Sequence, residues 1–313
     1  MIKEELLKKI NEKINKIKEI NLNFKIEKES IKTINLDNIE LKKDKKYGFI
    51  DSSYINGIIG PYTYVYSRAV IISEDLYDVI EDIEFFENTF LRSESGGNFD
   101  ISDISSLFSK NLEYKLARKY SDRYIFIDGS IISDGILYSK FLEKFDDERI
   151  EDRKKEFLEN FEYLINNGNL LAVAKRILNL DIIRKGKSDM IILMRAFPNE
   201  IFYTDIMEKE LDYFFKGKVP DEILNKIFNK KILIMYFRAR YNDHIYRIEG
   251  LEKIGREKFL EIIKENIYFY QSYPRYLKLA HNECKITNKE KNLLEFYIKK
   301  LLGFEESVGW ETH

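Results

Sequence analysis

Short apolar runs rich in β-branched and aromatic residues recur along the chain, and longer segments with helical spacing of apolar residues lie between them. No run reaches the 18 or more apolar residues that a membrane-spanning helix needs, so the runs predict the strands of a sheet in a water-soluble fold. Alternating strands and helices are typical of the α/β class. We expect strands within residues 48–54, 62–72, 124–131, 170–176, 190–197 and 231–241, with a turn at 56–61.

Helices are predicted where apolar residues recur every three or four positions. In residues 101–120 this spacing joins Ile104, Leu107, Leu112 and Leu116, and serines with an aspartate near the start suit a helix N-terminus. Further helices are expected at 147–166 and over 255–302 with a break at Tyr273-Pro274, and a loop is expected at 95–100.

The first twenty residues form an amphipathic pattern with a narrow apolar seam at Leu7, Ile10, Ile14 and Ile17. A helix of this kind packs either on its own domain or on a second copy or a partner, and the sequence leaves both open. We divide the chain into residues 1–46, the amphipathic helix with a connector, and 47–313, one α/β domain with a helical C-terminal part.

Charge and cysteine content narrow the class of protein. The 313 residues hold 52 Lys and Arg against 54 Asp and Glu, a net charge of −2, which excludes a globally basic nucleic-acid binder but not a local basic groove. A single cysteine, Cys284, cannot form an internal disulfide, so we expect a reducing cytoplasm. The charged N-terminal residues lack the apolar region of a signal peptide, and no membrane association is expected. No phosphate-loop motif supports an ATPase.

Two predicted strands end in an aspartate, and a predicted helix between them carries a glutamate. Asp51 and Asp128 each follow an isoleucine and precede a serine by two residues. Strand ends bring carboxylates together from distant sequence positions, and hard divalent cations take oxygen ligands. Asp51, Glu113 and Asp128 together therefore predict a metal site for phosphodiester cleavage. Taken singly, each is also explained as turn chemistry or a solvated helix residue.

This order of acids is similar to that of the ribonuclease-H-like fold, and the motifs resemble the NurA family, archaeal and bacterial DNA nucleases. The stretch FIDSS (49–53) looks like the first acidic motif of the family, although Ser52 stands where glycine is usual. The other matching segments are NLEYKLA (111–117) with the helical glutamate, YIFIDGSI (124–131) with the second aspartate, LAVAKR (171–176) with a lysine, and SYPRYLKLAHNECK (272–285) with a tyrosine and a histidine.

The resemblance implies a ribonuclease-H-like α/β fold, in which helices flank a mixed central sheet and further helices are added at both ends. It implies Asp51, Glu113 and Asp128 as ligands of two Mn²⁺ or Mg²⁺ ions. His281 would ligate a metal or move protons, and Tyr273 would position the strand. Lys175 would hold a phosphate or offset its charge.

The same resemblance implies 5′-to-3′ exonuclease and single-strand endonuclease activities on single-stranded DNA and double-stranded DNA ends. The expected role is double-strand-break end resection for homologous recombination and DNA repair, as a homodimer docked on a HerA-type hexameric ATPase. A catalytically inactive adaptor that keeps the fold and the docking is the alternative, and Ser52 is the feature that favours it. The sequence does not distinguish a nuclease that cleaves RNA from one that cleaves DNA.

Two further features leave alternatives open. Arg238, Arg240 and Arg247 alternate with aromatic residues, which suits either a phosphate-and-stacking surface for single-stranded DNA or one solvated face of a strand. Cys284 lies three residues after His281, which suits either a small buried residue or a nucleophile.

Overall fold

The computed structural model describes residues 7–13, 28, 31–42, 45–87, 101–142, 145, 147–175, 182–183, 188–217, 219, 221 and 224–303. The predicted loop at 95–100 lies outside these residues. Of the predicted helix over residues 1–20, only 7–13 are described, and they are helical and exposed. Leu7 and Ile10 are 47% and 40% exposed, so the apolar seam faces solvent over this stretch.

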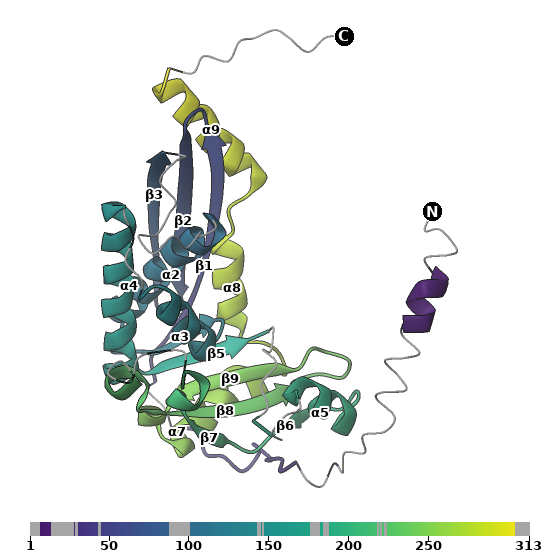
Figure 1. Cartoon of the computed structure of the whole chain (residues 1–313). Helices are drawn as coiled ribbons and strands as arrows, with labels where there is room; N and C mark the ends of the chain where they lie inside the picture. The colour runs from purple at the N-terminus through teal and green to yellow at the C-terminus, as the bar shows by residue number, and fades with distance from the viewer. Residues whose placement is uncertain are drawn as a thin grey trace.

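One sheet of nine strands forms the centre of the described chain (Figure 1). Its order is β3-β2-β1-β4-β5-β9-β8-β6, and β7 pairs with β8. The β1–β4 and β4–β5 pairs are parallel, whereas the other pairs are antiparallel. The strands are β1 (Tyr47–Ile59), β2 (Tyr62–Ile72), β3 (Tyr77–Glu87), β4 (Tyr124–Asp128), β5 (Leu170–Ala174), β6 (Phe202–Tyr203), β7 (Met207–Glu210), β8 (Lys231–Arg238) and β9 (Tyr246–Leu251). The predicted mixed central sheet is confirmed.

Helices flank this sheet, as predicted. They are α2 (Ile101–Lys119), α3 (Ile131–Lys140), α4 (Glu148–Asn167), α5 (Asp189–Ala196), α7 (Arg256–Ile263), α8 (Arg275–Cys284) and α9 (Asn288–Leu301), with shorter helical segments η2 (Leu211–Phe214), η3 (Leu224–Phe228), η4 (Glu252–Ile254) and η5 (Lys264–Tyr268). The predicted break at Tyr273-Pro274 separates η5 from α8. None of the helices in the described ranges combines the length and the apolar character that crossing a bilayer needs.

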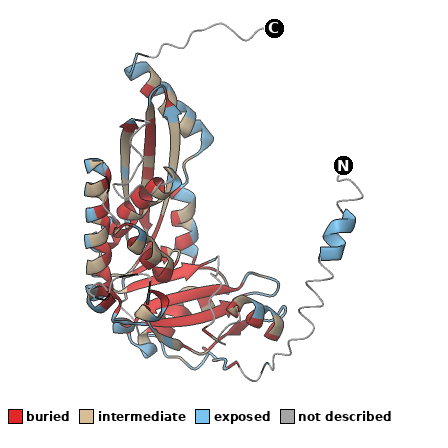
Figure 2. Cartoon of the chain, viewed as in Figure 1, coloured by how far each residue is buried: buried red, intermediate tan, exposed pale blue. Residues whose placement is uncertain are grey.

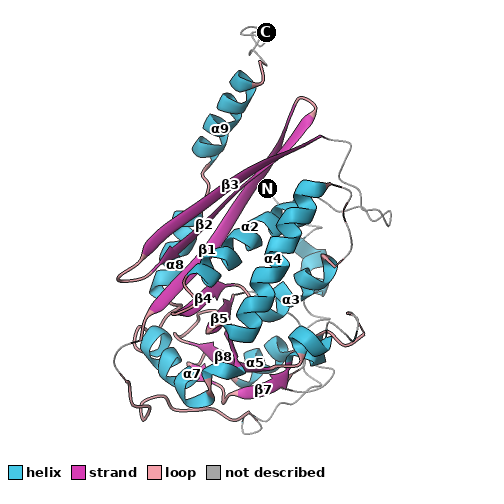
Figure 3. Ribbon diagram, turned by 90° about the vertical axis from the view of Figure 1, so that its left-hand side faces the viewer, coloured by secondary structure: helices cyan, strands magenta, loops and turns pink. Residues whose placement is uncertain are grey.

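Each face of the sheet has its own apolar core. Helices lie on both sides of the sheet (Figure 3), and many residues of the strands between them are buried (Figure 2). Helices α2, α3 and α4 pack on one face, over side chains such as Ile50 and Ile127. Helices α7 and α8 pack on the other, over Phe49 and Phe126. Successive side chains of a strand point to opposite faces, which is why the neighbours Phe49 and Ile50 enter different cores. The next residue, Asp51, therefore shares the α8 face with Phe49.

Strand β1 is longer than the sequence predicts. It pairs with β2 from Phe49–Ile72 to Ile59–Tyr62, so the predicted turn at 56–61 shrinks to residues 60–61. Asp51 consequently lies within β1, and the prediction that it ends a strand is wrong. Residues 52–59 stay extended because the backbone of β2 supplies their hydrogen bonds. Asp128, by contrast, is the last residue of β4, as predicted.

The prediction of a strand at 190–197 is also wrong, because these residues belong to helix α5. A short apolar run cannot be assigned to strand or helix from periodicity alone. Ile191 and Met194 are 48% and 55% exposed, whereas the true strand β5 is buried at every position. Asp189 anchors the start of the helix, since it accepts hydrogen bonds from the Ile183 N–H and the Tyr236 hydroxyl.

Two segments outside the central layers also contact the fold. In the segment 31–42, Leu36 is fully buried in the α8-side core, and Thr33 forms an isolated β-bridge with Thr204. Helix α9 lies beside the far end of the β1–β2 hairpin (Figure 1), where Ile298 packs with Ile59 and Tyr64.

Candidate metal centre

The parallel pairing of β1 with β4 ends at Ile50–Ile127, and an aspartate follows on each strand. Beyond this point β1 continues with β2 as its partner, while β4 ends at Asp128, which is still paired with Val173 of β5. Asp51 and Asp128 both take the α8 face, two residues after Phe49 and Phe126 respectively. The two carboxylates thus flank the position where the sheet loses a strand.

Helix α8 brings His281 to these aspartates. Its Nδ1 lies 2.7 Å from Asp51 Oδ2 and 3.9 Å from Asp128 Oδ2. One ligand atom from each of the three residues lies within 4.8 Å of the other two, and the described part of the chain holds no second group of this kind. Two carboxylates and an imidazole are a donor set for Mn²⁺, Zn²⁺ or iron, and the carboxylates also suit Mg²⁺.

The electrostatic setting of Asp51 favours a nearby positive charge. Burial raises the pKa of Asp51, and the charge of Asp128 raises it further. The hydrogen bonds from His281 and from the Ser52 N–H, at 2.8 Å, act in the opposite direction. Because a bound cation would stabilise both carboxylates in their charged forms, the site fits a divalent metal.

Glu113 lines a cavity together with Asp51 and Asp128, but it is not part of the group formed by Asp51, Asp128 and His281. This cavity of ≈ 350 Å³ is bordered by Asp51, Ser52, Lys110, Glu113 and Asp128, among others. Glu113 Oε2 accepts a hydrogen bond from Ser52 Oγ at 3.0 Å and lies 2.8 Å from Lys110 Nζ. Oε1 is buried without a hydrogen-bond partner among the described residues. Burial raises the pKa of Glu113, whereas the charge of Lys110 lowers it. A cation at the unpartnered Oε1 would also favour the charged carboxylate, so this oxygen fits a metal ligand.

Lys110 is a charged residue of this cavity that the sequence does not predict. Its ammonium lies 2.8 Å from Glu113 Oε2 and 3.3 Å from Asp134 Oδ2. Asp134, on α3, also accepts a hydrogen bond from Tyr114 at 2.9 Å. The three-residue spacing of Lys110 and Glu113 places both on one face of α2, and this was the available signal. The contact with Asp134 depends on the packing of α3 and has no sequence signal.

Ser52 replaces the glycine of the motif without strain. Among the described non-glycine residues only Asn242 and Gln271 have positive φ, so the backbone at Ser52 does not require glycine. Its hydroxyl donates to Glu113 and accepts from Ser109 Oγ at 2.8 Å. Ser52 therefore links β1 to α2 at the cavity.

Lys175 and Tyr273 complete the α8 side of the centre. Lys175 follows β5, and its ammonium contacts Asp128 Oδ2 and lies 4.5 Å from the ring centroid of Tyr273. The Tyr273 side chain is buried, and burial together with Asp128 raises its pKa well above the ordinary value. The hydroxyl therefore keeps its proton and can donate it to an acceptor.

The serine of the Asp-Gly-Ser motif has a structural role. Ser130 caps α3, where its Oγ accepts from the Ser133 N–H at 3.1 Å, and it donates to Glu249 Oε1 at 2.8 Å. Gly129 has φ +153°, a conformation that favours glycine, and a Cβ at this position would come 3.3 Å from Lys110 Nζ.

Arg238 and Arg247 are buried. The two predictions for them, a surface for single-stranded DNA and a solvated strand face, are therefore both wrong. Arg247 is fully buried and pairs with Glu249 at 2.6 Å. Arg238 is 5% exposed and donates to the Asp243 carbonyl at 3.0 Å. Both arginines satisfy internal acceptors, so neither is available to DNA. Arg240 is exposed and donates to the Gln271 carbonyl at 2.6 Å.

Cys284 is a buried small residue rather than an exposed nucleophile. It is fully buried, and its Sγ lies 3.4 Å from the His281 carbonyl. Burial raises the pKa of the thiol, which disfavours the reactive thiolate.

The family model of the NurA domain matches residues 45–286, which include all of the residues described at the centre. The chain belongs to the NurA family. No protein with a curated description matches the sequence.

Solved NurA structures have the same fold. The NurA nuclease from Sulfolobus solfataricus is 17% identical, with a TM-score of 0.64 over 98% of this chain and 100% of that one. A NurA bound to dAMP and manganese is 15% identical, with a TM-score of 0.65 over 93% and 96% of the two chains. A NurA with manganese is 15% identical, with a TM-score of 0.65 over 96% of this chain and 98% of that one. The predicted ribonuclease-H-like α/β architecture is thus that of a NurA protein along nearly the whole chain.

Proposed function

We propose that this chain is a divalent-metal-dependent DNA nuclease. The observation that carries the proposal is the approach of Asp51, Asp128 and His281 within 4.8 Å, although they come from two strands and a helix. Membership of the NurA family supports the proposal. So does the NurA structure with dAMP and manganese, since that relative holds both a nucleotide and a metal.

Asp51, Asp128 and His281 are the proposed metal ligands, and Glu113 adds a carboxylate from across the cavity. The unpartnered Oε1 of Glu113 favours this role. When bound, the metal supplies a Lewis acid for the phosphodiester and for the attacking water. We propose Mn²⁺ or Mg²⁺, with two ions when the Glu113 side of the cavity is filled.

One of the proposed ligands, His281, and the neighbouring Lys175 and Tyr273 move the proton and hold the phosphate. Hydrolysis joins a water oxygen to phosphorus, breaks the bond from phosphorus to the leaving sugar oxygen, and transfers one proton from water to that oxygen. The His281 side chain is 42% exposed, which lets it exchange this proton with solvent. The Lys175 ammonium offsets negative charge on the phosphoryl oxygens. The Tyr273 hydroxyl donates to a phosphate oxygen and so positions the strand.

The specific activities, the biological role and the assembly that we propose are those implied by the resemblance to the NurA family. We propose 5′-to-3′ exonuclease and single-strand endonuclease activities, used in the cytoplasm for resection of double-strand-break ends in recombinational repair. A homodimer docked on a HerA-type hexameric ATPase is the proposed assembly, with the helix in residues 1–46 as one candidate contact and the domain at 47–313 as the nuclease. The exposed Leu7 and Ile10 support a contact there.

The test is cleavage of labelled linear single- and double-stranded DNA with Mn²⁺, with Mg²⁺ or with chelator. Asp51→Asn and Asp128→Asn should each lower the rate at least about 100-fold, since even residues that only support a metal ligand contribute about 10- to 100-fold. Asp103→Asn, on α2 outside the cavity, is the matched control and should cleave like wild type. Cleavage that survives chelator or persists in Asp51→Asn overturns the metal mechanism.

Two other functions are outcomes of the same experiment. An adaptor would bind DNA without cutting it, and Mn²⁺ would shift the melting temperatures of wild type and Asp128→Asn equally. A metal-binding wild type should instead gain about 2.7 kcal/mol at a hundredfold excess of metal over Kd, and the variant should not. A labelled RNA of the same sequence tests substrate class, because faster cleavage of RNA than of DNA overturns the assignment to DNA.

A further inference from the structure

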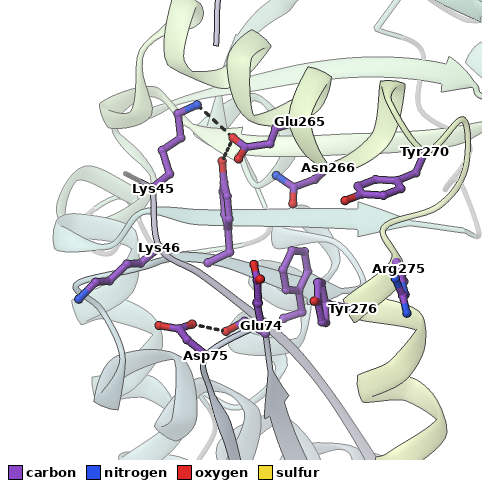
Figure 4. A pocket seen from close by; sticks show the side chains of 12 residues that line it. Lys45, Lys46, Glu74, Asp75, Glu265, Asn266, Tyr270, Arg275 and Tyr276 are labelled. Carbon is purple, nitrogen blue, oxygen red and sulfur yellow. Dashed lines mark hydrogen bonds and ion pairs between the residues drawn. The ribbon is translucent and has the colours of Figure 1, made fainter. Parts of the chain in front are cut away.

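A second pocket lies on the α8 face of the sheet, beside the start of β1 (Figure 4). Its volume is ≈ 240 Å³. It is lined by Tyr47 and Phe49 of β1, by Asn266 and Tyr270, and by Arg275 and Tyr276 at the start of α8. Nothing in the proposed chemistry uses these residues.

The aromatic walls of this pocket are fixed before any ligand arrives. Tyr276 stacks on Phe49 with ring centroids 5.6 Å apart, and Phe49 stacks on Phe126 at 4.9 Å. The Tyr47 hydroxyl donates to Glu265 Oε2 at 2.6 Å, and the same oxygen lies 3.1 Å from Lys45 Nζ. Since packing and hydrogen bonds hold Tyr47, Phe49 and Tyr276 in place, a planar ligand loses little free energy to the ordering of these side chains when it binds.

Polar groups at the mouth of the pocket are open to a ligand. Lys46, Glu74 and Arg275 are exposed and make no side-chain hydrogen bond or ion pair with any described residue. The Tyr270 ring is 55% exposed. Asn266 Nδ2 donates to the Ile262 carbonyl at 3.0 Å, and the amide also bonds the Tyr47 side chain, so its oxygen is the group that can serve a ligand.

Ring faces, an amide, a carboxylate and two cations together match the chemistry of a nucleotide. Bases stack on aromatic rings, and their edges pair with amide and carboxylate groups. Lysine and arginine bind the phosphate. An apolar ligand would leave the polar groups unused, and a metal ion would leave the rings unused.

Strand β1 and the α8 segment, which line the pocket, also carry residues of the proposed metal centre. Phe49 precedes Asp51 by two residues on the same face of β1, a rise of about 7 Å. Tyr276 lies between Tyr273 and His281 along the α8 segment. A strand with one nucleotide in the pocket would therefore have a nearby phosphodiester at the centre.

We propose that this pocket holds an unpaired nucleotide of the DNA strand that is cut at the metal centre. Tyr270 and Tyr276 stack on the base, and Arg275 contacts the phosphate. The proposal rests on the proposed function, but it concerns binding and is tested without turnover.

The experiment measures the fluorescence anisotropy of a short fluorescein-labelled oligodeoxythymidine in chelator, with the full chain. Tyr270→Ala should raise Kd about fivefold or more, as expected for one lost stacking contact. Arg275→Ala should lower the slope of log K against log salt by about 0.7, the value for one phosphate of a single strand. Tyr297→Ala on α9, where the side chain is similarly exposed at 53%, is the matched control and should bind like wild type.

Photocrosslinking with the same oligonucleotide carrying 5-iodouracil gives a readout independent of affinity. The crosslink should map to Tyr270 or Tyr276. Crosslinks confined to other segments, or Tyr270→Ala and Arg275→Ala binding within twofold of Tyr297→Ala, would overturn the proposal. Thymidine monophosphate that competes as strongly as the oligonucleotide would also overturn it, since the pocket would then serve free nucleotides. Failure of the nuclease assignment differs visibly, because wild type would bind the oligonucleotide and leave it uncut with Mn²⁺.

Discussion

Replacement of Lys110 by methionine tests whether the buried acids of the cavity depend on an internal cation. The side chains of Glu113 and Asp134 are 0% and 6% exposed, and that of Lys110 is 17% exposed. Lys110→Met keeps the approximate shape and removes the charge that faces both carboxylates. Loss of one partner from a buried ion pair costs about 3–5 kcal/mol, because the remaining charge is left uncompensated. We expect a loss of that size in the metal-free protein at about pH 8.

The effect should shrink as the pH falls. Burial raises the pKa of Glu113 above its ordinary value, so its protonated form is favoured in the folded protein. For such an acid the stabilisation by protonation is fully present below the unfolded-state pKa and is lost as pH rises through the folded-state pKa. Without Lys110 the folded-state pKa rises further. The defect should therefore be smallest near about pH 5, where Glu113 takes up a proton instead of an ion partner.

The assay is guanidinium unfolding in chelator at both pH values. Lys115→Met, on the same helix, is the matched control, because this lysine is 50% exposed and its pair with Glu156 should contribute about 1 kcal/mol or less. Lys110→Met combined with Glu113→Gln should recover part of the loss. A Lys110→Met protein within about 1 kcal/mol of wild type at about pH 8 would refute the reasoning, and so would a double variant no more stable than Lys110→Met.

Three further predictions concern separate parts of the molecule. Asp51→Asn should melt at a higher temperature than wild type in chelator above about pH 7, because burial raises the pKa of Asp51 and the charged form is therefore disfavoured in the folded state; an equal or lower melting temperature contradicts this. Gly250→Ala should lose about 1–3 kcal/mol by denaturant unfolding, since the new Cβ would meet the Phe259 ring at 2.6 Å. Thr287→Ala should lose about 1 kcal/mol, because it breaks the capping box with Glu290 at the start of α9, and an unchanged unfolding midpoint would count against it.

Much of the fold follows from local sequence patterns. The strand at 62–72 and the helix at 101–119 form where β-branched residues and helical spacing predict them, because one pattern dominates each segment. Helix α5 escaped prediction because its apolar residues surround the helix, which hides the period. The continuation of β1 beyond Asp51 also escaped, since it depends on pairing with β2.

The candidate site shows the same division. The acids Asp51 and Asp128 stand out because each follows an apolar strand segment, a position where a charge needs a reason. Lys110 did not, because a lysine beside a glutamate on a helix is ordinary until α3 places Asp134 against it. Arg247 follows Tyr246 in a strand-rich stretch, which suits a binding surface or a solvated strand face, and its burial beside Glu249 is recognised only from the strand packing.

The alternation of side chains along β1 decides on which side of the molecule any chemistry can take place. Phe49 and Asp51 face α8, whereas Ile50 and Ser52 face α2. A slip of β1 by a single residue would turn the carboxylate toward the opposite helices and bring an isoleucine to the histidine. The length of the hairpin beyond residue 53 can therefore vary far more freely in evolution than the number of residues from Tyr47 to Ile50. This number determines which face of the sheet carries the carboxylate of Asp51.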